Sequence, residues 1–293
     1  MGWTRTRAAL CVIFVAAVGG SQAAPQPNGF YPPLPSKAES AWAEYLKVTE
    51  YRINHELGAP TRFLALDFAP TALADRQAVQ RGEIPVAQLT ARWENGTTVS
   101  VPDHWVHHWR GAVLLSGVKL DRVFMRLKQE IPGIGTAALV KAEIRGRQGD
   151  QLHTFMEVQR SGSAIGVISY RYVYDTLHTV EFTSLSPTTG KSTSVATRIA
   201  ERSHLGTPEE RDATPKEDHR FLLRWNSYWR YQETAAGVIA ECESITLSMD
   251  PGFLLSAVGA RGIAESAAQD AMTQALVNLR AFFRTPPVPS PAR

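Results

Sequence analysis

The stretch that decides the fold lies between residues 220 and 284. It contains two runs rich in aromatic and apolar residues, FLLRWNSYWRYQE at residues 221–233 and VIAECESITLSM at residues 238–249. A short break at residues 235–237 separates the runs, which predicts an antiparallel β-hairpin. The apolar spacing after this hairpin is helical. This order predicts the closing hairpin of a curved antiparallel sheet, with a C-terminal helix lying in its concave face.

The region before this hairpin has the pattern of an antiparallel meander. Short strand-like runs alternate with turn-forming stretches such as Gln148-Gly149-Asp150 and Ser161-Gly162-Ser163. A short helix is expected over residues 120–127, and a charged loop at residues 203–219 interrupts the meander. The predicted strands span residues 104–115, 138–145, 152–160, 164–174, 178–184 and 192–202.

Residues 24–103 form a separate pattern ahead of the meander. Residues 24–36 are proline-rich, which favours an extended leader. Apolar residues then recur at helical spacing over residues 37–57, and Gly58 supplies the stop. The elements expected after this helix are a strand at residues 62–68, a helix at residues 71–82, and a hairpin of residues 86–94 and 97–101 joined by Asn95-Gly96.

The N-terminus has the features of a secretory signal peptide. Arg5 and Arg7 precede an apolar run over residues 8–18, and the small residues around Ala23 predict cleavage after that position. The apolar run is about half of the roughly 20 residues that span a bilayer, so we expect no permanent membrane helix. The sequence therefore predicts export by a Sec-type signal, to the periplasm or the extracellular space.

Charge and cysteine content narrow the class of protein. Removing residues 1–23 takes away two arginines and no acidic residue, which lowers the formal net charge from +3 to +1. A charge this close to neutral gives no indication of the basic surface that nucleic-acid-binding proteins have. Cys242 is the single cysteine left after cleavage, so we expect no intramolecular disulfide and a fold stabilised by its packed core.

The order of elements over residues 104–284 resembles the START-like, or polyketide-cyclase-like (SRPBCC), superfamily. The segments that carry the resemblance are WRGAVLLSGVKLDRVFMRL at residues 109–127 and RWNSYWRYQETAAGVIAECESITLSM at residues 224–249. The resemblance implies an α+β helix-grip fold, in which a curved antiparallel sheet wraps around a long C-terminal helix. It also implies a cavity between sheet and helix that takes lipids, sterols, isoprenoids, polyketides or other apolar molecules. The predicted parts of the chain are a signal peptide at residues 1–23, an N-terminal extension at 24–103, a helix-grip domain at 104–285 and a proline-rich tail at 286–293.

The last helix supports a cavity independently of the resemblance. Alanines in the middle of its expected inward face would leave volume open to a ligand. The alternative is that the same alanines allow the helix to pack closely on the sheet without a void. The expected inward residues are Ala264, Ala267, Ala268, Ala271, Ala275, Leu276, Leu279 and Phe283.

The polar candidates are charged residues of the last hairpin. Glu241 and Glu243 share one face of their strand, and Arg224 and Arg230 share one face of the preceding strand. On the concave face, a desolvated carboxylate beside an arginine could act as an acid or a base. The alternative is an ion pair on the solvent face. The candidate ligand-lining residues are Trp109, Trp229, Tyr231, Arg230, Glu241, Glu243, Ala264, Ala268, Ala271 and Ala275.

Three further motifs do not indicate a metal site, a cofactor site or a catalytic nucleophile. His104 and His108 share a strand face about 13 Å apart, at roughly 3.3 Å per residue. This is too far to chelate one ion, since zinc–nitrogen distances are about 2 Å. Residues 133–138 match the letters of a dinucleotide-binding fingerprint, but a helix precedes them and a strand follows, so they predict a loop. Cys242 alternates with packed residues, which disfavours a nucleophile. We therefore expect no metal and no cofactor.

Three classes of function remain open. The first is a secreted binding protein for an apolar small molecule, which the export signal and the resemblance favour. The second is a cyclase- or hydrolase-type enzyme that uses Glu241, Glu243, Arg230 or His107 in the same cavity. The third is a protein-binding module of the cell envelope, which the N-terminal extension motivates. The sequence does not indicate the identity of the ligand or the oligomeric state.

Overall fold

The computed structural model describes residues 32–284 except for 137, 165–167 and 251–259. The predicted signal peptide at residues 1–23 and the tail at residues 286–293 lie outside the described residues. Within the described ranges, none of the helices combines the length and the apolar character needed to cross a lipid bilayer.

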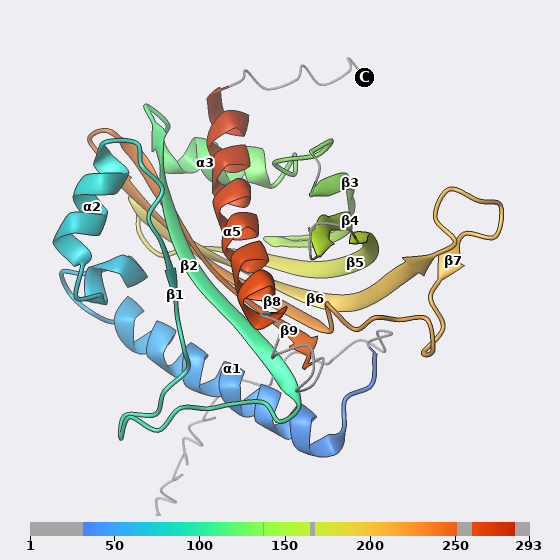
Figure 1. Ribbon diagram of the computed structural model, residues 1–293. Coiled ribbons are helices and arrows are strands. Elements are labelled where there is room, and N and C mark those ends of the chain that lie inside the picture. Colours follow the sequence, from blue (N-terminus) through green and yellow to red (C-terminus); the bar gives the residue numbers. More distant parts are fainter. Residues whose placement is uncertain (1–31, 137, 165–167, 251–259, 285–293) are drawn as a thin grey trace, which may run out of the picture.

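The described residues form helices and strands arranged in layers (Figure 1). The helices are α1 (Ser36–Leu57), α2 (Ala72–Gln80), α3 (Leu120–Leu127) and α5 (Ala260–Arg284), with the short 3-10 helix η1 (Ala65–Phe68). The strands are β1 (Val86–Gln88), β2 (His104–Ser116), β3 (Leu139–Gln148), β4 (Gln151–Ala164), β5 (Ile168–Ser184), β6 (Thr189–Ser203), β7 (Arg211–Asp212), β8 (Arg224–Thr234) and β9 (Gly237–Met249).

A curved antiparallel sheet forms the centre of the fold. Its strand order is β1-β2-β9-β8-β6-β5-β4-β3, with β7 paired to β6. The pairing of β2 with β9 joins strands that lie far apart in the sequence. The helix α5 lies on the concave side of the sheet, and α1 and α2 lie on the other side (Figure 1). This arrangement confirms the predicted α+β helix-grip fold.

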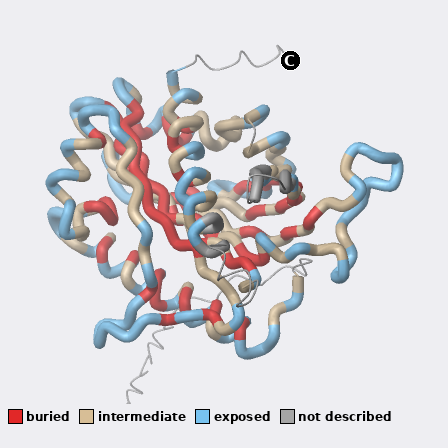
Figure 2. Tube along the Cα trace, in the orientation of Figure 1, coloured by how far each residue is buried: buried red, intermediate tan, exposed pale blue. Residues whose placement is uncertain are grey.

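The strand β2 is covered on both faces, because its side chains alternate between two layers. A Cβ atom added to Gly111 would lie 2.6 Å from Leu276 Cδ1, so the odd-numbered residues of β2 face α5. The Tyr45 hydroxyl of α1 lies 2.8 Å from His108 Nδ1, so the even-numbered residues face α1. Figure 2 shows buried residues running along most of β2. We call the side of the sheet that faces α5 the concave face, and the side that faces α1 the outer face.

The larger hydrophobic core lies between the concave face, α3 and α5. Met272, Leu276 and Leu279 of α5 pack against residues of the sheet. The ring of Phe124 in α3 lies edge-on to the ring of Tyr231, with 5.2 Å between their centroids. Burying a large apolar side chain contributes about 1.5–3 kcal/mol to the stability of the folded chain. The sheet residues of this core include Trp109, Val113, Leu115, Leu152, Phe182, Tyr231, Val238, Ala240 and Cys242.

The N-terminal residues pack against the outer face and complete a second core there. Side chains from α1 cover one part of this face, and side chains from η1 and α2 cover another. The short strand β1 also extends the sheet beyond β2. The boundary predicted at residue 103 stays a prediction, although residues on either side of it share buried contacts. The N-terminal contributors are Ala38, Trp42, Tyr45, Val48, Ile53, Leu64, Leu66 and Val79.

The strand predicted at residues 62–68 is wrong, because this segment contains the 3-10 helix η1. Carboxylates, and not a neighbouring strand, accept the amide hydrogen bonds of residues 63–66. The Glu241 carboxylate accepts from the amides of Ala65 and Leu66, at 2.5 and 2.8 Å. Asp67 accepts in the same way from the amides of the two residues before η1. Backbone donors satisfied by carboxylates have no need of a partner strand.

Two strand predictions also differ in detail. The strands predicted at residues 164–174 and 178–184 form the single strand β5, because its pairing with β4 and β6 continues across the predicted break. The hairpin predicted at residues 86–101 is reduced to β1 and one bridge between Arg92 and Thr98. Near the Asn95-Gly96 turn the two arms still share backbone hydrogen bonds, from the Trp93 amide to the Thr97 carbonyl at 2.9 Å and from the Val99 amide to the Ala91 carbonyl at 3.0 Å.

Candidate functional site on the concave face

Three serines lie side by side across the middle of the concave face. The strand register pairs Ser244 of β9 with Ser227 of β8, and Ser227 with Ser194 of β6. Trp109 of β2 is paired with Ser244 and continues the same row. We call Ser194, Ser227 and Ser244 the serine row. Ser194 and Ser244 are half-buried although they lie on central strands, so the side chains packed on this face leave them accessible.

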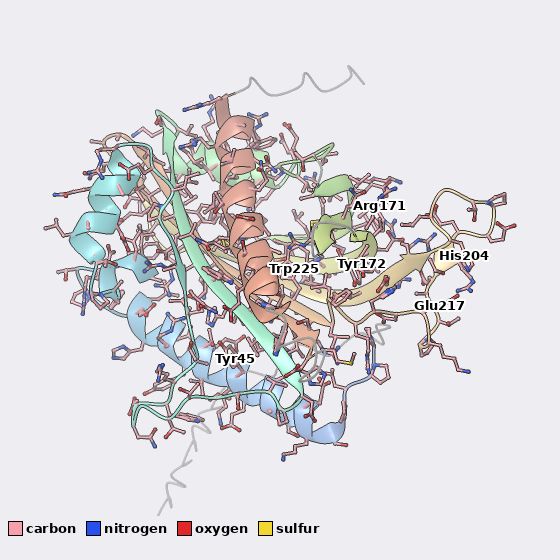
Figure 3. All side chains as sticks on the ribbon, in the orientation of Figure 1. Tyr45, Arg171, Tyr172, His204, Glu217 and Trp225 are labelled. Atoms are coloured by element: carbon pink, nitrogen blue, oxygen red, sulfur yellow. The ribbon has the colours of Figure 1, made fainter. Side chains whose placement is uncertain are left out.

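Trp225 of β8 fixes two members of the serine row. Its indole Nε1 lies 3.0 Å from Ser227 Oγ and 3.2 Å from Ser244 Oγ, and it donates to both. Ser227 Oγ lies 3.4 Å from Ser244 Oγ and donates to it. Figure 3 labels Trp225 on the sheet beside α5, and Tyr45 on α1. The oxygen atoms of these two serines are therefore held by one shared donor.

His178 of β5 binds the other end of the serine row. Its Nδ1 lies 3.2 Å from Ser194 Oγ, and its Nε2 lies 3.1 Å from Thr176 Oγ1. The edge of its ring meets Trp225, with 4.9 Å between the ring centroids. Complete burial lowers the pKa of His178 to about 3, so the imidazole is neutral at physiological pH. A neutral imidazole beside hydroxyl groups is a hydrogen-bonding group and a poor base.

Two buried polar atoms on this face have no hydrogen-bond partner among the described residues. They are Trp109 Nε1, next to Ser244 in the row, and Thr154 Oγ1, opposite His178 in the register. The exposed fractions are 8% for Trp109 and 5% for Thr154. Leaving a buried donor or acceptor without a partner costs about 1–3 kcal/mol. Native proteins pair nearly all such groups, so a bound molecule or water is the expected partner.

The row beside the serines on the side of α3 contains side chains that are aromatic, small or neutral and polar. Burial raises the pKa of the Cys242 thiol well above its usual value, so this group also stays neutral. A molecule on this part of the concave face would therefore meet aromatic surface and neutral hydrogen-bonding groups. The residues of that row are Gly111, Cys242, Trp229, Ser192 and Phe182.

Four of the predicted lining residues lie in or against the concave core. Trp109 and Tyr231 are buried within it, and Trp229 and Ala268 pack against it. The structure therefore brings Trp109 and Trp229 close to the serine row through the strand register. Their contact with a ligand stays a prediction.

The helix α5 is rotated relative to the predicted stripe. Ala275 is exposed, so its predicted place in the cavity lining is wrong. Ala271 is half-buried, and the side chain of Ala264 lies outside the described residues. Of the predicted inward residues, Ala268, Leu276, Leu279 and Phe283 do pack in or against the concave core. Helical spacing of four, four and three residues adds Met272 at the centre of this face.

The charged candidates Arg230, Glu241 and Glu243 lie on the outer face, so their predicted place in the cavity lining is wrong. The even-numbered residues of β9 face α5, and side chains alternate along a strand, so both glutamates point toward the N-terminal residues. The alternative of a solvent-exposed ion pair is also wrong, since all three side chains are buried. Arg224 also faces α1, where it donates to Glu39 at 2.7 Å.

These charged residues hold α1 against the sheet. Glu243 Oε1 lies 2.7 Å from His108 Nε2, and it also accepts a hydrogen bond from Arg52 of α1. Arg230 donates to Glu56 of α1 at 2.5 Å. Glu243 and Arg230 therefore tie α1 to the outer face, while Glu241 accepts hydrogen bonds from the amides of η1.

The remaining sequence motifs lie apart from the serine row. His104 Nδ1 lies 2.7 Å from the Pro102 carbonyl oxygen, and His107 Nε2 lies 3.0 Å from Ser248 Oγ. Across the part of the chain that the structure describes, no group of three His, Cys, Asp or Glu side chains is placed to hold a metal ion. Residues 133–136 form turns between α3 and β3, which confirms the predicted loop.

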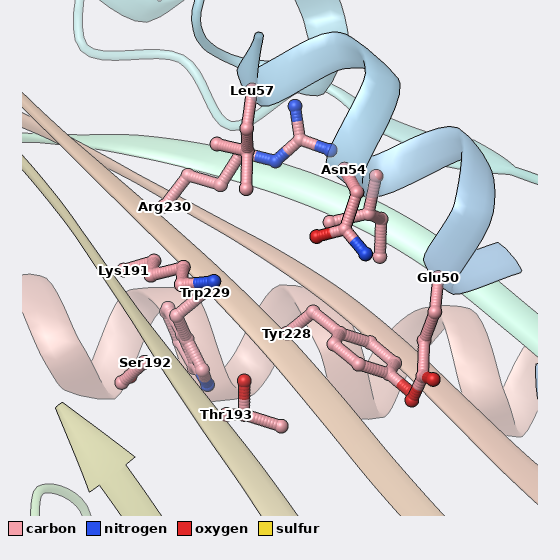
Figure 4. Close-up of a pocket in the computed structure, with 10 residues that line it drawn as sticks. Glu50, Asn54, Leu57, Lys191, Ser192, Thr193, Tyr228, Trp229 and Arg230 are labelled. Carbon is pink, nitrogen blue, oxygen red and sulfur yellow. The ribbon is translucent and has the colours of Figure 1, made fainter. Parts of the chain in front are cut away.

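Two pockets lie beside α1. The first has a volume of about 180 Å³ and lies between α1 and the strands β6 and β8 (Figure 4). The second, of about 560 Å³, lies between the loop after α1 and the ends of the same strands. In the first pocket, Arg230 and Tyr228 already bind Glu56 and Glu50 of α1. We place the candidate site on the concave face, where Trp109 and Thr154 have buried polar atoms without partners.

Comparison with known proteins identifies similar structures only. No protein-family model matches the sequence, and no curated protein matches it. One similar structure is a STAR-related lipid transfer protein from Xanthomonas axonopodis, with 12% identity and a TM-score of 0.36; the match covers 68% of this chain and 99% of that one. Another is the lipid transfer and protein localization domain of human StarD13, with 9% identity and a TM-score of 0.36; it covers 73% and 97% of the two chains.

A third similar structure is the di-domain ARO/CYC protein StfQ from the steffimycin biosynthetic pathway. The identity is 9% and the TM-score 0.33, and the match covers 61% of this chain and 50% of StfQ. This chain therefore spans about half the length of StfQ.

Sequence reasoning missed the serine row and His178. Ser227 and Ser244 alternate with apolar and aromatic residues in the two runs of the last hairpin, which indicates polar positions on a packed face. Their contact with each other and with Ser194 depends on the register of β6, β8 and β9. A single sequence does not define that register, because a shift by one residue exchanges the two faces of a strand.

Proposed function

We propose that this chain is an exported protein that binds an uncharged, largely apolar small molecule between the concave face and α5. The observation that carries the proposal is the pair of buried polar atoms without partners, Trp109 Nε1 and Thr154 Oγ1. A bound molecule that forms hydrogen bonds with them would remove the free-energy cost of their burial. Both side chains lie on the face that α5 covers, beside the accessible hydroxyls of Ser194 and Ser244.

The surroundings of these atoms favour an apolar body on the ligand. Trp225 and Trp229 present aromatic surface beside the serine row, and Met272 of α5 packs into the same core. Aromatic and apolar walls with a few placed polar groups are typical of small-molecule sites. A charged ligand group would lose its hydration in these rows without meeting an opposite charge, which is unfavourable.

The first test measures whether the purified protein carries a small molecule. We expect native mass spectrometry to detect a bound molecule that organic extraction removes, and the extracted protein to take up the fluorescent probe 1-N-phenylnaphthylamine. Trp109→Phe keeps the ring and removes the Nε1 donor, so we expect it to lower the occupancy of the copurified molecule. The matched control is Trp93→Phe, because Trp93 Nε1 donates to Glu44 of α1, on the opposite side of the sheet. Absence of both a copurified molecule and probe uptake in the folded wild type would overturn the proposal.

Export is a separate part of the proposal. Its support is the charged N-terminus, the apolar run over residues 8–18 and the small residues before Ala24. We expect N-terminal sequencing of protein collected outside the cytoplasmic membrane to begin at Ala24. Intact Met1 on soluble cytoplasmic protein would contradict export without affecting ligand binding.

The enzyme alternative has less support than the sequence suggested. It relied on Glu241, Glu243 and Arg230 facing the ligand, and these side chains bind the N-terminal residues on the outer face. His107, its other candidate, contacts Ser248. A binding function without turnover needs none of these groups.

A further inference from the structure

The hydrogen atoms along the serine row can be assigned from one fixed contact. Thr176 Oγ1 lies 3.1 Å from the carbonyl oxygen of Met156, and because a carbonyl only accepts, the Thr176 hydroxyl donates its single proton there. His178 Nε2 lies 3.1 Å from the same Thr176 oxygen. Since Thr176 donates its only proton to Met156, its oxygen accepts the hydrogen bond from His178 Nε2. The Nε2 atom of His178 therefore carries the ring proton.

This tautomer determines what Ser194 offers to a ligand. In a neutral imidazole with its proton on Nε2, Nδ1 has a lone pair and accepts. Burial keeps His178 neutral, because it lowers the pKa of the ring to about 3. Ser194 Oγ lies 3.2 Å from Nδ1 and therefore donates its only proton to it. Toward α5, the Ser194 oxygen presents lone pairs alone and is a hydrogen-bond acceptor.

At the other end of the row, Ser244 and Trp109 are hydrogen-bond donors. Trp225 Nε1 and the Ser227 hydroxyl both donate to Ser244 Oγ. With its lone pairs occupied, Ser244 has its own proton left to donate, and no acceptor for that proton lies among the described residues. Trp109 Nε1, the next polar atom in the row, also has no partner there, and an indole nitrogen only donates.

We propose that the serine row has a fixed hydrogen-bond polarity that selects a ligand with a donor at one end and an acceptor at the other. Ser194 binds an O–H or N–H group of the ligand, and Ser244 with Trp109 binds a carbonyl or ether oxygen. Ser244 and Ser194 are two strand spacings apart, which is about 10 Å. The ligand class is therefore an uncharged, rigid, apolar molecule with a hydroxyl or amine group and a carbonyl or ether group at opposite ends. This inference rests on the proposed binding function.

Other polar groups near the row do not reverse this polarity. The Ser192 hydroxyl and the Tyr231 hydroxyl lie 3.2 Å apart and bind each other. The Thr154 hydroxyl can donate or accept, so it adds a hydrogen-bonding partner beside His178 without fixing a direction. The direction is set by Ser194 and Ser244.

The test uses four fluorescent naphthalenes with one scaffold. 2-Acetyl-6-hydroxynaphthalene has the acceptor and the donor at opposite ends. 2-Acetyl-6-methoxynaphthalene lacks the donor, 6-ethyl-2-naphthol lacks the carbonyl acceptor, and 2,6-dimethylnaphthalene lacks both. We expect the extracted wild-type protein to bind the first compound about tenfold more tightly than the second or the third, as one neutral hydrogen bond predicts.

Two variants assign the two ends of the row. Ser194→Val removes the acceptor and covers Nδ1 of His178, so we expect it to abolish the preference for hydroxyl over methoxy and to keep the preference for acetyl over ethyl. Ser244→Ala combined with Trp109→Phe removes the donors at the other end. We expect this variant to lose the preference for acetyl over ethyl and to keep the preference for hydroxyl over methoxy. The wild-type comparison tests the polarity even if a variant does not fold.

The outcomes separate this inference from the proposed function. If 2,6-dimethylnaphthalene binds but the methoxy and ethyl compounds bind as tightly as 2-acetyl-6-hydroxynaphthalene, the polarity is overturned and the binding function stands. If the methoxy compound binds more tightly than the hydroxyl compound, the assigned direction is wrong. If none of the four compounds binds to the folded protein, the proposed function fails, and this inference fails with it.

Discussion

Glu241 and Glu243 lie two residues apart on β9 and point to the same side of the sheet, but their pKa values are shifted in opposite directions. Burial raises the pKa of Glu241 from 4.5 to about 7, against the opposing effects of Arg230 and of the amides that it binds. Burial acts on Glu243 in the same sense, but the hydrogen bond and charge of His108 and the charge of Arg52 outweigh it. The pKa of Glu243 is therefore lowered to about 2. Glu241 accepts hydrogen bonds from two backbone amides, and Glu243 binds the side chains of His108 and Arg52.

The buried pair of Glu243 and His108 should be important for stability. We expect Glu243→Ala to lower the free energy of unfolding by about 3–5 kcal/mol, because it leaves His108 and Arg52 without their carboxylate. Urea denaturation followed by tryptophan fluorescence measures this change. The control is Glu143→Ala, which removes a solvent-exposed carboxylate from the surface pairs with Lys141 and Arg145. A midpoint for Glu243→Ala equal to that of the control would show that the network does not stabilise the fold.

The dependence of stability on pH should separate the two glutamates. The folded pKa of Glu241 lies above its unfolded value, so the folded chain holds this proton more tightly between pH 4.5 and about 7. Stability contributed by Glu241 is present below pH 4.5 and is lost as the pH rises toward 7. We expect Glu241→Gln to remove this loss, measured as unfolding midpoints between pH 4 and 8.

Glu243 should have the reverse dependence. Its folded pKa lies below its unfolded value, so its contribution is present above pH 4.5 and is lost as the pH falls toward 2. We expect Glu243→Gln to flatten the acid side of the stability profile and to leave the interval from pH 5 to 7 unchanged. If the stability of Glu241→Gln depends on pH from 4.5 to 7 as that of the wild type does, Glu241 is not the group that causes the loss of stability in this interval.

The contact between α5 and β2 should be sensitive to one methyl group. A Cβ atom at Gly111 would lie 2.6 Å from Leu276 Cδ1 and 3.1 Å from Met272 Cγ. We expect Gly111→Ala to destabilise the protein by about 1–3 kcal/mol through overpacking. The matched control is Gly262→Ala in α5, where a Cβ atom meets nothing within 4 Å. That change should stabilise the helix by roughly 0.5–1 kcal/mol.

Two alanines of α5 should respond differently to a large side chain. Ala268 packs against the concave core, and Ala275 is exposed. We expect Ala268→Trp to abolish uptake of 1-N-phenylnaphthylamine by filling space on the concave side, and Ala275→Trp to bind the probe like the wild type. Equal uptake by both variants, with melting temperatures close to that of the wild type, would exclude a ligand beside Ala268.

The sequence predicted the fold well because local patterns determine most of it. The hairpin of residues 221–249, the helix ending at Gly58 and the short helix before residue 128 follow from periodicity and from turn residues. The order of these elements was enough for the helix-grip fold. The 3-10 helix at residues 65–68 could not be predicted in this way, because Glu241, about 175 residues away in the sequence, accepts its amide hydrogen bonds.

The candidate site was harder to predict, because it depends on which face of each strand points inward. Alternation in β9 shows that Cys242 and Ser244 share a face and that Glu241 and Glu243 share the other. Nothing in that segment alone indicates which face α5 covers. The choice depends on α1, whose Arg52 and Tyr45 bind the network around Glu243 and His108. Both faces of the sheet are covered here, so hydrophobicity did not distinguish them.

The hydrogen bond between Arg52 and Glu243 joins residues 191 positions apart, and it has a consequence for the order in which the chain folds. The helix α1 is synthesised well before β9, which supplies part of the surface that α1 binds. Contacts this distant in the sequence form slowly, because a long loop must close first. We expect α1 to dock only after β9 has paired with β2, so a chain synthesised only as far as β8 stays incompletely folded. Such a delay would suit the proposed export, because passage through a translocation channel requires an unfolded chain.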